Sequence, residues 1–395
     1  MGADSDTIEC LIAQRTPGFS LPQAFYRRED VFARDLRLLE DRWTFVGHES
    51  ELAAPGDWIA AGFGRESAII VRGEEGRVRA LANVCRHRGS RVCVEARGHS
   101  ALLTCPYHAW TYRLDGSLRA AREMDPEFDL GTHGLKPLAV EIVGGLIFVS
   151  FGPAPPSLAK AAPALAAMTG AYGWARARIA ARRSYAVSAN WKLALENYHE
   201  CYHCGPAHPE FSVLHQLARP RTRRLRTAEE SRAAGLAVAD FEAWGPKDDG
   251  CEVVRVMRSE LTAGAHTGSR DGSLLAPLMG PDDGACVFAE LGYLSAFLAY
   301  ADHGVAYRFI PRGVLATEME VLWLVDREAE AGRDFDPDAL TWLWDVTSLA
   351  DKRIIERNQE GVLSRFYEPG PFSQMEPGAR QFADRYLADL SAVPA

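Results

Sequence analysis

Two short segments of the sequence each place a histidine close behind a cysteine. The first is Cys85-Arg86-His87, and the second, after a gap of 17 residues, is Cys105-Pro106-Tyr107-His108. Each segment offers one thiolate and one imidazole, and two such loops can hold a compact metal centre from two sides. The spacing therefore predicts a metal site with two sulfur and two nitrogen ligands.

Two kinds of metal centre use this set of ligands. In a Rieske [2Fe–2S] cluster, two cysteines hold one iron and two histidines hold the other. Structural zinc sites usually take both cysteines from one loop and both histidines from another. Because each loop here carries one ligand of each type, the pattern favours the iron–sulfur cluster. The remaining alternative is four buried side chains that bind no metal.

The residues around these ligands resemble the Rieske domain of ring-hydroxylating and related oxygenases. The resemblance covers Cys85 to Ser90 and Cys105 to Trp110, and it implies Cys85, His87, Cys105 and His108 as cluster ligands. The family usually has glycine in place of Ala109, a change that only tightens the turn. Respiratory Rieske proteins carry an additional disulfide near the cluster; Ser90 stands where its first cysteine would fall, and Cys93 does not match. The resemblance is therefore to the oxygenases.

A second group of metal-binding residue types lies between positions 199 and 208. His199-Glu200-x-x-His203 has the H-E-x-x-H form of zinc peptidases, with two histidines one helical turn apart. Glu200-x-x-His203-x4-His208 resembles instead the mononuclear iron motif of the oxygenases. The longer peptidase signature needs a glycine three and a histidine six residues past the second histidine, whereas Gly205 and His208 fall at two and five. We therefore expect iron here and a structural role for His199.

Ferrous iron in oxygenases is typically held by two histidines and one carboxylate, with open positions for oxygen and substrate. His203 and His208 supply the imidazoles, the second from beyond a helix break at Pro206. The carboxylate has to come from elsewhere in the chain. The best candidate is Asp351, on a helix that is expected to begin at Asp336-Pro337, an N-cap followed by proline.

Asp351 shares the core-facing stripe of this helix with Trp344 and Ile355. A buried carboxylate is costly unless it is paired, and a bound cation would pair it. Glu356 lies about 140° further round the helix, so we expect it to face solvent. The alternative is that Asp351 is a buried structural residue bonded to the backbone or to an arginine such as Arg353.

The resemblance to the oxygenases extends to the neighbours of these ligands. It includes Asn190-Trp191-Lys192, Glu196-Asn197 and Gln359-Glu360-Gly361, and it implies Glu200 and Asn197 as catalytic residues. In the family, the carboxylate that matches Glu200 joins a cluster histidine of one chain to an iron histidine of the next. Carried over, Glu200 connects the partner subunit's His108 to His203. This implies a ring-shaped oligomer, usually a homotrimer.

The pattern along the chain predicts an α+β protein. Residues 9 to 45 have helical apolar spacing, and residues 56 to 151 form short β-type runs, among them a hairpin around Gly73 to Gly76. We expect an all-β Rieske domain at 43–155 inserted in a larger α+β catalytic domain, for which the resemblance implies a helix-covered antiparallel sheet. That domain comprises a helical part at 1–42 and the mononuclear-iron part at 156–395.

Composition excludes several classes of protein. The 395 residues carry a net charge of −9 and no basic stripe, which disfavours a nucleic-acid partner. No apolar run approaches the roughly 20 residues that cross a membrane. The acidic start lacks the layout of a signal peptide, so we expect a cytoplasmic location. The eight cysteines do not form a disulfide framework, and we expect them to be free or bound to metal.

The segment Phe366 to Ser373 resembles the branch of the family that acts on quaternary ammonium compounds such as betaines. Those enzymes hydroxylate an N-methyl group, which leaves as formaldehyde, with electrons from a flavin- or ferredoxin-type reductase that uses NAD(P)H. An aromatic box would suit such a substrate, and Tyr202, Trp244, Tyr293 and Tyr300 are available, although each taken alone is more typical of core packing. The alternatives are hydroxylation of an aromatic ring or acid, a simple electron carrier, and a zinc peptidase.

Overall fold

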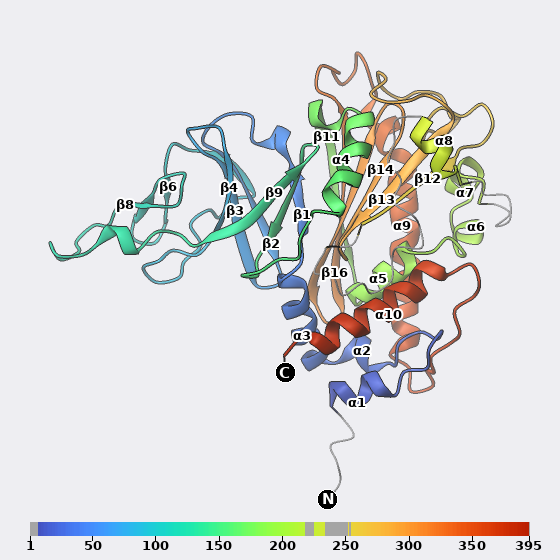
Figure 1. Ribbon diagram of the computed structural model, residues 1–395, viewed down its shortest axis with the longest axis horizontal. Helices are drawn as coiled ribbons and strands as arrows, with labels where there is room; N and C mark the ends of the chain where they lie inside the picture. Colours follow the sequence, from blue (N-terminus) through green and yellow to red (C-terminus); the bar gives the residue numbers. More distant parts are fainter. Residues whose placement is uncertain (1–6, 218–224, 234–251, 253, 395) are drawn as a thin grey trace, which may run out of the picture. The chain divides into compact units, whose positions relative to one another are not determined.

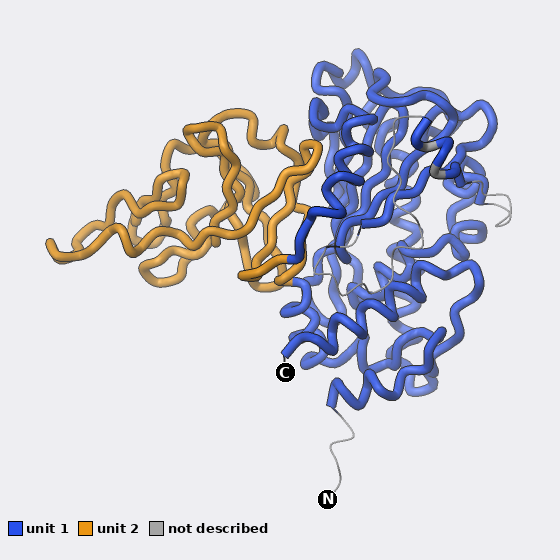
Figure 2. Tube along the Cα trace, viewed as in Figure 1, with its two compact units in different colours: residues 1–39, 156–395 blue, residues 40–155 orange. Residues whose placement is uncertain are grey.

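The computed structural model describes residues 7–217, 225–233, 252 and 254–394. The chain divides into two compact units, shown in Figure 2: residues 40–155, called the β unit here, and residues 1–39 with 156–395, called the α+β unit. The α+β unit is thus assembled from two stretches of sequence, one on each side of the β unit. This arrangement and the mixed content of helix and strand confirm the expected fold class.

Antiparallel strands build the β unit (Figure 1). One sheet has the order β1-β10-β9-β4-β3-β2-β5 and a smaller one has the order β6-β7-β8. The predicted hairpin is the β3–β4 pair, whose turn contains Gly76 at φ 81°. The strands are β1 (Thr44–His48), β2 (Asp57–Phe63), β3 (Glu66–Arg72), β4 (Val78–Ala82), β5 (Arg97–His99), β6 (Leu103–Thr104), β7 (Thr111–Tyr112), β8 (Leu118–Ala120), β9 (Pro137–Val143) and β10 (Leu146–Ser150), with short 3₁₀ turns at Glu49–Glu51 and Leu130–Thr132.

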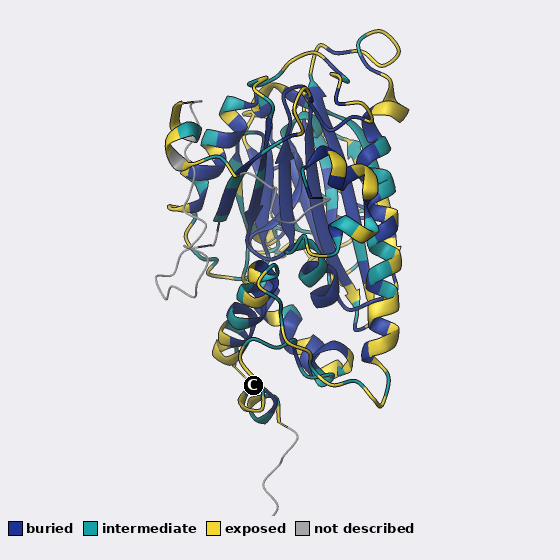
Figure 3. Cartoon of the chain, turned by 90° about the vertical axis from the view of Figure 1, so that its right-hand side faces the viewer, coloured by how far each residue is buried: buried dark blue, intermediate teal, exposed yellow. Residues whose placement is uncertain are grey.

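The α+β unit contains an antiparallel sheet of order β11-β16-β15-β14-β13-β12. Strands β13 to β16 of this sheet are largely buried, whereas β11 at its edge is partly exposed, and the helices around the sheet expose their outer faces (Figure 3). The strands are β11 (Ala177–Val187), β12 (Val254–Glu260), β13 (Ala285–Leu291), β14 (Ser295–Ala299), β15 (Gly304–Gly313) and β16 (Ala316–Asp326). The helices are α1 (Ile8–Ala13), α2 (Ala24–Arg27), α3 (Glu29–Glu40), α4 (Ala161–Ala171), a 3₁₀ turn at Trp174–Arg176, α5 (Trp191–Tyr198), α6 (Cys204–Ala207), α7 (Pro209–Leu214), α8 (Ala228–Ala233), α9 (Pro337–Val362) and α10 (Pro377–Ala392). Among the helices in the described ranges, none combines the length and apolar character that a membrane span requires.

Helix α9 begins where the sequence predicts it. The Asp336 side chain accepts hydrogen bonds from the backbone N–H groups of Asp338 and Ala339, at 2.8 and 3.3 Å, and Pro337 occupies the first helical position. The helix buries Leu340, Leu343, Trp344, Thr347, Ile355 and Val362 of the predicted stripe. Because this face packs inward, α9 carries the residue at position 351 to the interior side of the unit.

A buried ionic cluster fixes helix α5. Lys192 pairs with Asp35 of α3, and both side chains are fully buried. The same carboxylate accepts hydrogen bonds from Trp191 Nε1 at 3.0 Å and from the Tyr386 hydroxyl of α10 at 2.6 Å. A buried charge is tolerated when it is paired and hydrogen-bonded in this way. The first turn of α5 is therefore held between α3 and α10, and this fixes where the helix that leads into residues 199–208 begins.

Candidate metal centres

The two cysteine–histidine segments of the β unit form loops of one geometry. In each loop the cysteine N–H donates to the carbonyl five residues later, Ser90 or Trp110, at 2.8 Å. The cysteine carbonyl in turn accepts from the N–H four residues later, Gly89 or Ala109, at 3.0 Å. Because both loops have the same backbone hydrogen bonds, each holds its cysteine and its histidine in a similar conformation.

The loops lie side by side and bring their ligand atoms together. His87 Nδ1 and His108 Nδ1 are 3.1 Å apart and both rings are exposed, whereas Cys85 and Cys105 are buried. Burial, and then the neighbouring Cys105, raise the pKa of the Cys85 thiol, although its hydrogen bond with the Tyr112 hydroxyl acts in the opposite direction. Two buried sulfurs and two converging imidazoles fit a [2Fe–2S] cluster, in which sulfur and nitrogen ligands hold different irons.

Ala109 has a backbone conformation that disfavours any side chain. Its φ is 58°, and Gly89 at the equivalent position of the other loop has φ 78°. Positive φ costs a residue with a Cβ about 1–2 kcal/mol. We expect Ala109→Gly to stabilise the β unit by about 1 kcal/mol, since glycine's greater freedom in the unfolded chain offsets part of this gain. The measurement is the temperature at which the cluster's visible absorption is lost.

The control for this prediction is Gly89→Ala. A Cβ at Gly89 would meet no atom within 4 Å, so its cost would come from the backbone alone. We expect this variant to lose its cluster at a lower temperature. A lower unfolding temperature for Ala109→Gly would contradict the prediction.

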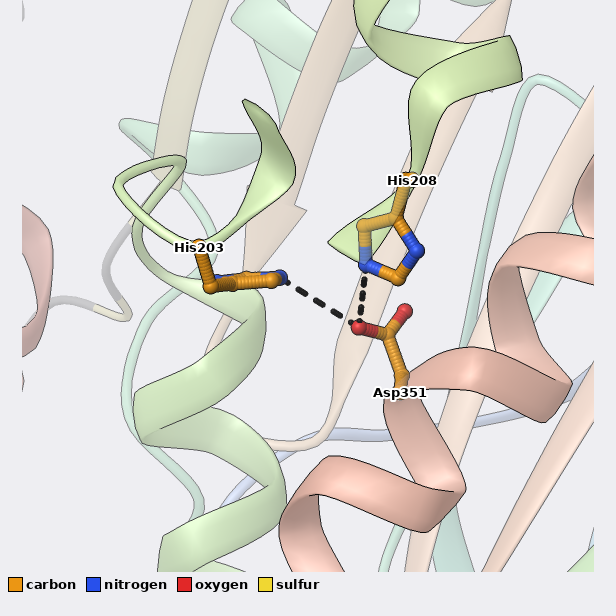
Figure 4. Close-up of side chains that lie close together, drawn as sticks. All are labelled: His203, His208 and Asp351. Carbon is orange, nitrogen blue, oxygen red and sulfur yellow. Dashed lines mark hydrogen bonds and ion pairs between the residues drawn. The ribbon is translucent and has the colours of Figure 1, made fainter. Parts of the chain in front are cut away.

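The second site gathers three side chains from the α+β unit. His203 immediately precedes α6, His208 joins α6 to α7, and Asp351 lies in the middle of α9 (Figure 4). Asp351 Oδ1 is 2.8 Å from His208 Nε2 and 3.3 Å from His203 Nε2. One ligand atom from each side chain lies within 4.8 Å of the other two. Two imidazoles and one carboxylate that face a common point fit the ferrous sites of oxygenases.

The charges around this point stabilise a cation. Burial disfavours the ionised form of Asp351, but its hydrogen bonds to His203 and His208 outweigh this and lower its pKa. Burial likewise disfavours protonated His203, yet Asp351 and Glu200 raise its pKa to about 10. The two carboxylates therefore favour a positive charge at this point, whether it is a proton on His203 or a bound cation.

Glu200 and Asn197 orient the ring of His203. Glu200 Oε1 is hydrogen-bonded to His203 Nδ1, and its Oε2 accepts from the backbone N–H groups of Tyr202 and His203. Because Nδ1 is engaged, Nε2 is turned toward Asp351. The Asn197 amide lies 3.3 Å from that Nε2. A carboxylate that holds the outer nitrogen of a ligand histidine is a common support for a metal site.

The local chain path differs from the sequence expectation. Helix α5 ends at Tyr198, and His199 is its C-terminal cap, so Glu200 and His203 do not lie on one continuous helix with His199. The break also falls later than Pro206, which lies inside α6; the chain leaves helical geometry at His208, with φ −131° and ψ 71°. Pro209 then starts α7, because proline suits a first helical position. The H-E-x-x-H geometry of zinc peptidases is therefore not formed.

The triad opens into a cavity of about 320 Å³. Its wall includes apolar side chains, namely Phe211, Leu217, Met257, Phe288, Trp344 and Met375, together with Arg255 and Glu290 of the sheet. Except for Trp344 of the α9 stripe, these residues were not predicted from the sequence. The available signal was Glu290, the one charged residue within the otherwise apolar strand β13.

Of the aromatic residues proposed for a substrate box, the three that the structure describes do not line this cavity. Tyr202 is 54% exposed. Tyr293 is buried and donates to Asp389, and Tyr300 is buried and bonded to His215. Trp244 lies outside the described residues. The two buried tyrosines pack in the core because their hydroxyls find partners there.

The other carboxylate on α9 has a structural environment. Glu356 is partly buried; it pairs with Lys352 and accepts a hydrogen bond from the Ser188 N–H at 2.9 Å. The expectation that it faces solvent is thus only partly met. Of the carboxylates on α9, Asp351 is the one that the structure places within reach of both histidines.

Two family models match the chain. The model of the Rieske [2Fe-2S] domain matches residues 42–140, and that of the ring hydroxylating alpha subunit catalytic domain matches residues 174–392. These segments contain the two candidate metal centres, one in each unit.

Similar proteins cover nearly the whole chain. The glycine betaine monooxygenase oxygenase subunit of Chromohalobacter salexigens is 37% identical, over 98% of this chain and 89% of the relative. The protein of that name from Pseudomonas aeruginosa is 34% identical, over 95% and 90%. The crystal structure of a quaternary ammonium Rieske monooxygenase shares the fold, with a TM-score of 0.75, 24% identity and 98% of both chains covered. The chain therefore belongs to the Rieske oxygenases with a ring-hydroxylating alpha-subunit catalytic domain.

Proposed function

We propose that this chain is the oxygenase subunit of a monooxygenase that removes an N-methyl group from a betaine-type quaternary ammonium substrate. The observation that carries the proposal is that His203, His208 and Asp351 line one cavity with apolar and aromatic side chains. Such a wall suits a methylated ammonium group. The relatives with glycine betaine monooxygenase names, similar over nearly the whole chain, support the substrate class.

Each group of ligands has a proposed task. Cys85, His87, Cys105 and His108 would hold the [2Fe–2S] cluster, and His203, His208 and Asp351 would hold ferrous iron. When bound, the iron activates O₂ for hydroxylation. The polypeptide orients the ligand rings, excludes water with the apolar wall, and presents the N-methyl group of the substrate.

The overall reaction balances with two electrons. One oxygen atom of O₂ enters a C–H bond of the N-methyl group, and the other leaves as water with two protons. The C–N bond of the N–CH₂OH group then breaks, its electron pair stays on nitrogen and the hydroxyl proton is released, which gives formaldehyde and the amine with one methyl group fewer. The electrons come from outside the chain, and we propose a flavin- or ferredoxin-type reductase as their source; the relatives are likewise oxygenase subunits.

We further propose that Glu200 connects the two metal centres across a subunit boundary in a homotrimer. Its side chain is 10% exposed, and each carboxylate oxygen can accept more than one hydrogen bond. It can therefore hold His203 and still accept from an imidazole of a neighbouring chain. Inter-subunit electron transfer is described for the structurally similar quaternary ammonium monooxygenase.

The substrate class can be tested by coupling oxygen uptake to formaldehyde release. With a surrogate reductase and NADH, we expect glycine betaine or a related N-methylated amino acid to stimulate uptake and to give formaldehyde in equal amount. Omission of the reductase is the control and should abolish both signals. Coupled turnover of benzoate-like acids, with no response to any betaine, would favour aromatic hydroxylation instead.

A further inference from the structure

A pair of opposite charges lies on the sheet at the wall of the cavity. Arg255 of β12 and Glu290 of β13 are directly opposite each other across the two strands. The next pair on the same face, Met257 and Phe288, is apolar and lines the same cavity. Because side chains on a strand alternate between faces, all four point to one side of the sheet. The sheet thus contributes one ionic and one apolar pair to the site.

Glu290 is buried, and in the described part of the chain only its Oε1 has a hydrogen-bond partner. Its side chain is 7% exposed, and Oε1 is engaged by the Arg255 guanidinium and by His199 Nδ1 at 3.3 Å. Among the described residues, no hydrogen-bond partner reaches the buried Oε2. Burial disfavours the charged form, but Arg255 and His199 outweigh it and lower the pKa of Glu290 to about 2. Glu290 is therefore a carboxylate anion at neutral pH.

A buried anionic oxygen without a partner is unfavourable, and a cationic ligand in the adjacent cavity would satisfy it. A quaternary ammonium group suits this position, because its charge is spread over methyl groups and it has no N–H that needs an acceptor. Phe288 and Trp344 supply aromatic surface for the remaining methyl groups. The site therefore combines a carboxylate, whose charge Arg255 balances, with an apolar wall.

We propose that Glu290 is the counter-ion of the substrate's quaternary ammonium group, and that Arg255 is a positioning residue which holds this carboxylate in place. The inference rests on the proposed function and names the residue that selects the substrate's charge. Since Arg255 already neutralises Glu290, a substrate with a carboxylate of its own leaves the net charge of the cavity unchanged. We therefore expect a zwitterionic betaine to be preferred over a choline-type cation.

The experiment compares glycine betaine with 3,3-dimethylbutanoate, in which carbon replaces the charged nitrogen at almost unchanged shape. Binding to the metal-loaded enzyme is measured by calorimetry without oxygen. We expect the wild type to prefer glycine betaine by at least about tenfold, which corresponds to about 1.4 kcal/mol. Glu290→Gln should lower this preference to about threefold or less, with unchanged affinity for 3,3-dimethylbutanoate. Arg255→Lys keeps the ion pair and should retain most of the preference.

The matched control is Glu320→Gln. Glu320 is equally buried in the same sheet and pairs with Arg182 and Arg308, but it does not line the cavity. This variant should leave the preference unchanged. Equal binding of both ligands by the wild type, or an equal loss of both in Glu290→Gln, would overturn this inference alone. A wild-type enzyme that neither binds nor demethylates any betaine would overturn the proposed function together with it.

Discussion

Asp351→Ala is expected to lose the mononuclear iron and all measurable turnover. Asp351 Oδ1 is the atom that approaches both imidazoles, at 2.8 Å from His208 Nε2 and 3.3 Å from His203 Nε2. Without this oxygen, only the two neutral histidine ligands remain. Removal of a residue that merely supports a metal ligand typically lowers metal affinity roughly 10–100-fold, and removal of the ligand itself should lower it further. Iron content should fall from about three to about two atoms per chain, because the [2Fe–2S] cluster is retained.

Glu356→Ala is the control, since it removes a carboxylate from the same helix. The Glu356 carboxylate forms an ion pair with Lys352 and accepts a hydrogen bond from the Ser188 N–H, so its loss should leave the iron content unchanged. The cluster's visible and electron-paramagnetic signals should be normal in both variants. If Asp351→Ala kept its third iron while Glu356→Ala lost it, the proposed iron ligand would be the wrong carboxylate.

Glu200→Gln is expected to retain both metal centres and yet to lose nearly all substrate oxidation. A glutamine keeps the size of the side chain, but its amide nitrogen cannot accept the hydrogen bonds that a carboxylate accepts from two imidazoles. The measurement is the rate at which the reduced cluster is reoxidised in a single turnover with substrate and oxygen. We expect this rate to fall by at least about 100-fold, or about 2.7 kcal/mol in the barrier.

Glu210→Gln provides the comparison, because Glu210 is an exposed carboxylate on the adjacent helix α7. In Glu210→Gln, the reduced cluster should be reoxidised at the same rate as in the wild type. A normal rate in Glu200→Gln would mean that electrons take another route. Loss of the mononuclear iron from Glu200→Gln would instead mean that this residue is itself a ligand.

The sequence was informative where a site is built from short segments. The loops at 85–90 and 105–110 close on their own hydrogen bonds, so the spacing of cysteine and histidine was enough to predict that they present ligands together. The same holds for His203 and His208, which are five residues apart. Asp351 could be predicted because the amphipathic pattern of α9 shows which of its faces turns inward.

The fold was predictable for a similar reason. The hairpin between β3 and β4, the capped start of α9 and the insertion of a strand-rich unit follow from turn residues, caps and the spacing of apolar residues. The path from residue 199 to residue 208 was not predictable in detail. There the chain leaves the helix at Tyr198 because Glu200 binds backbone N–H groups and His203, which a spacing rule does not reveal.

The wall of the cavity was decided by the tertiary structure. The sequence pattern of each strand predicts the face on which Arg255 or Glu290 lies. Only the pairing of β12 with β13 brings the two side chains together. Likewise, Tyr293 and Tyr300 are aromatic residues of the kind that a substrate box needs, and their hydrogen bonds hold them in the core instead. Metal ligands are fixed by local geometry, whereas a cavity is formed by side chains far apart in sequence, so its composition depends on strand register and helix packing.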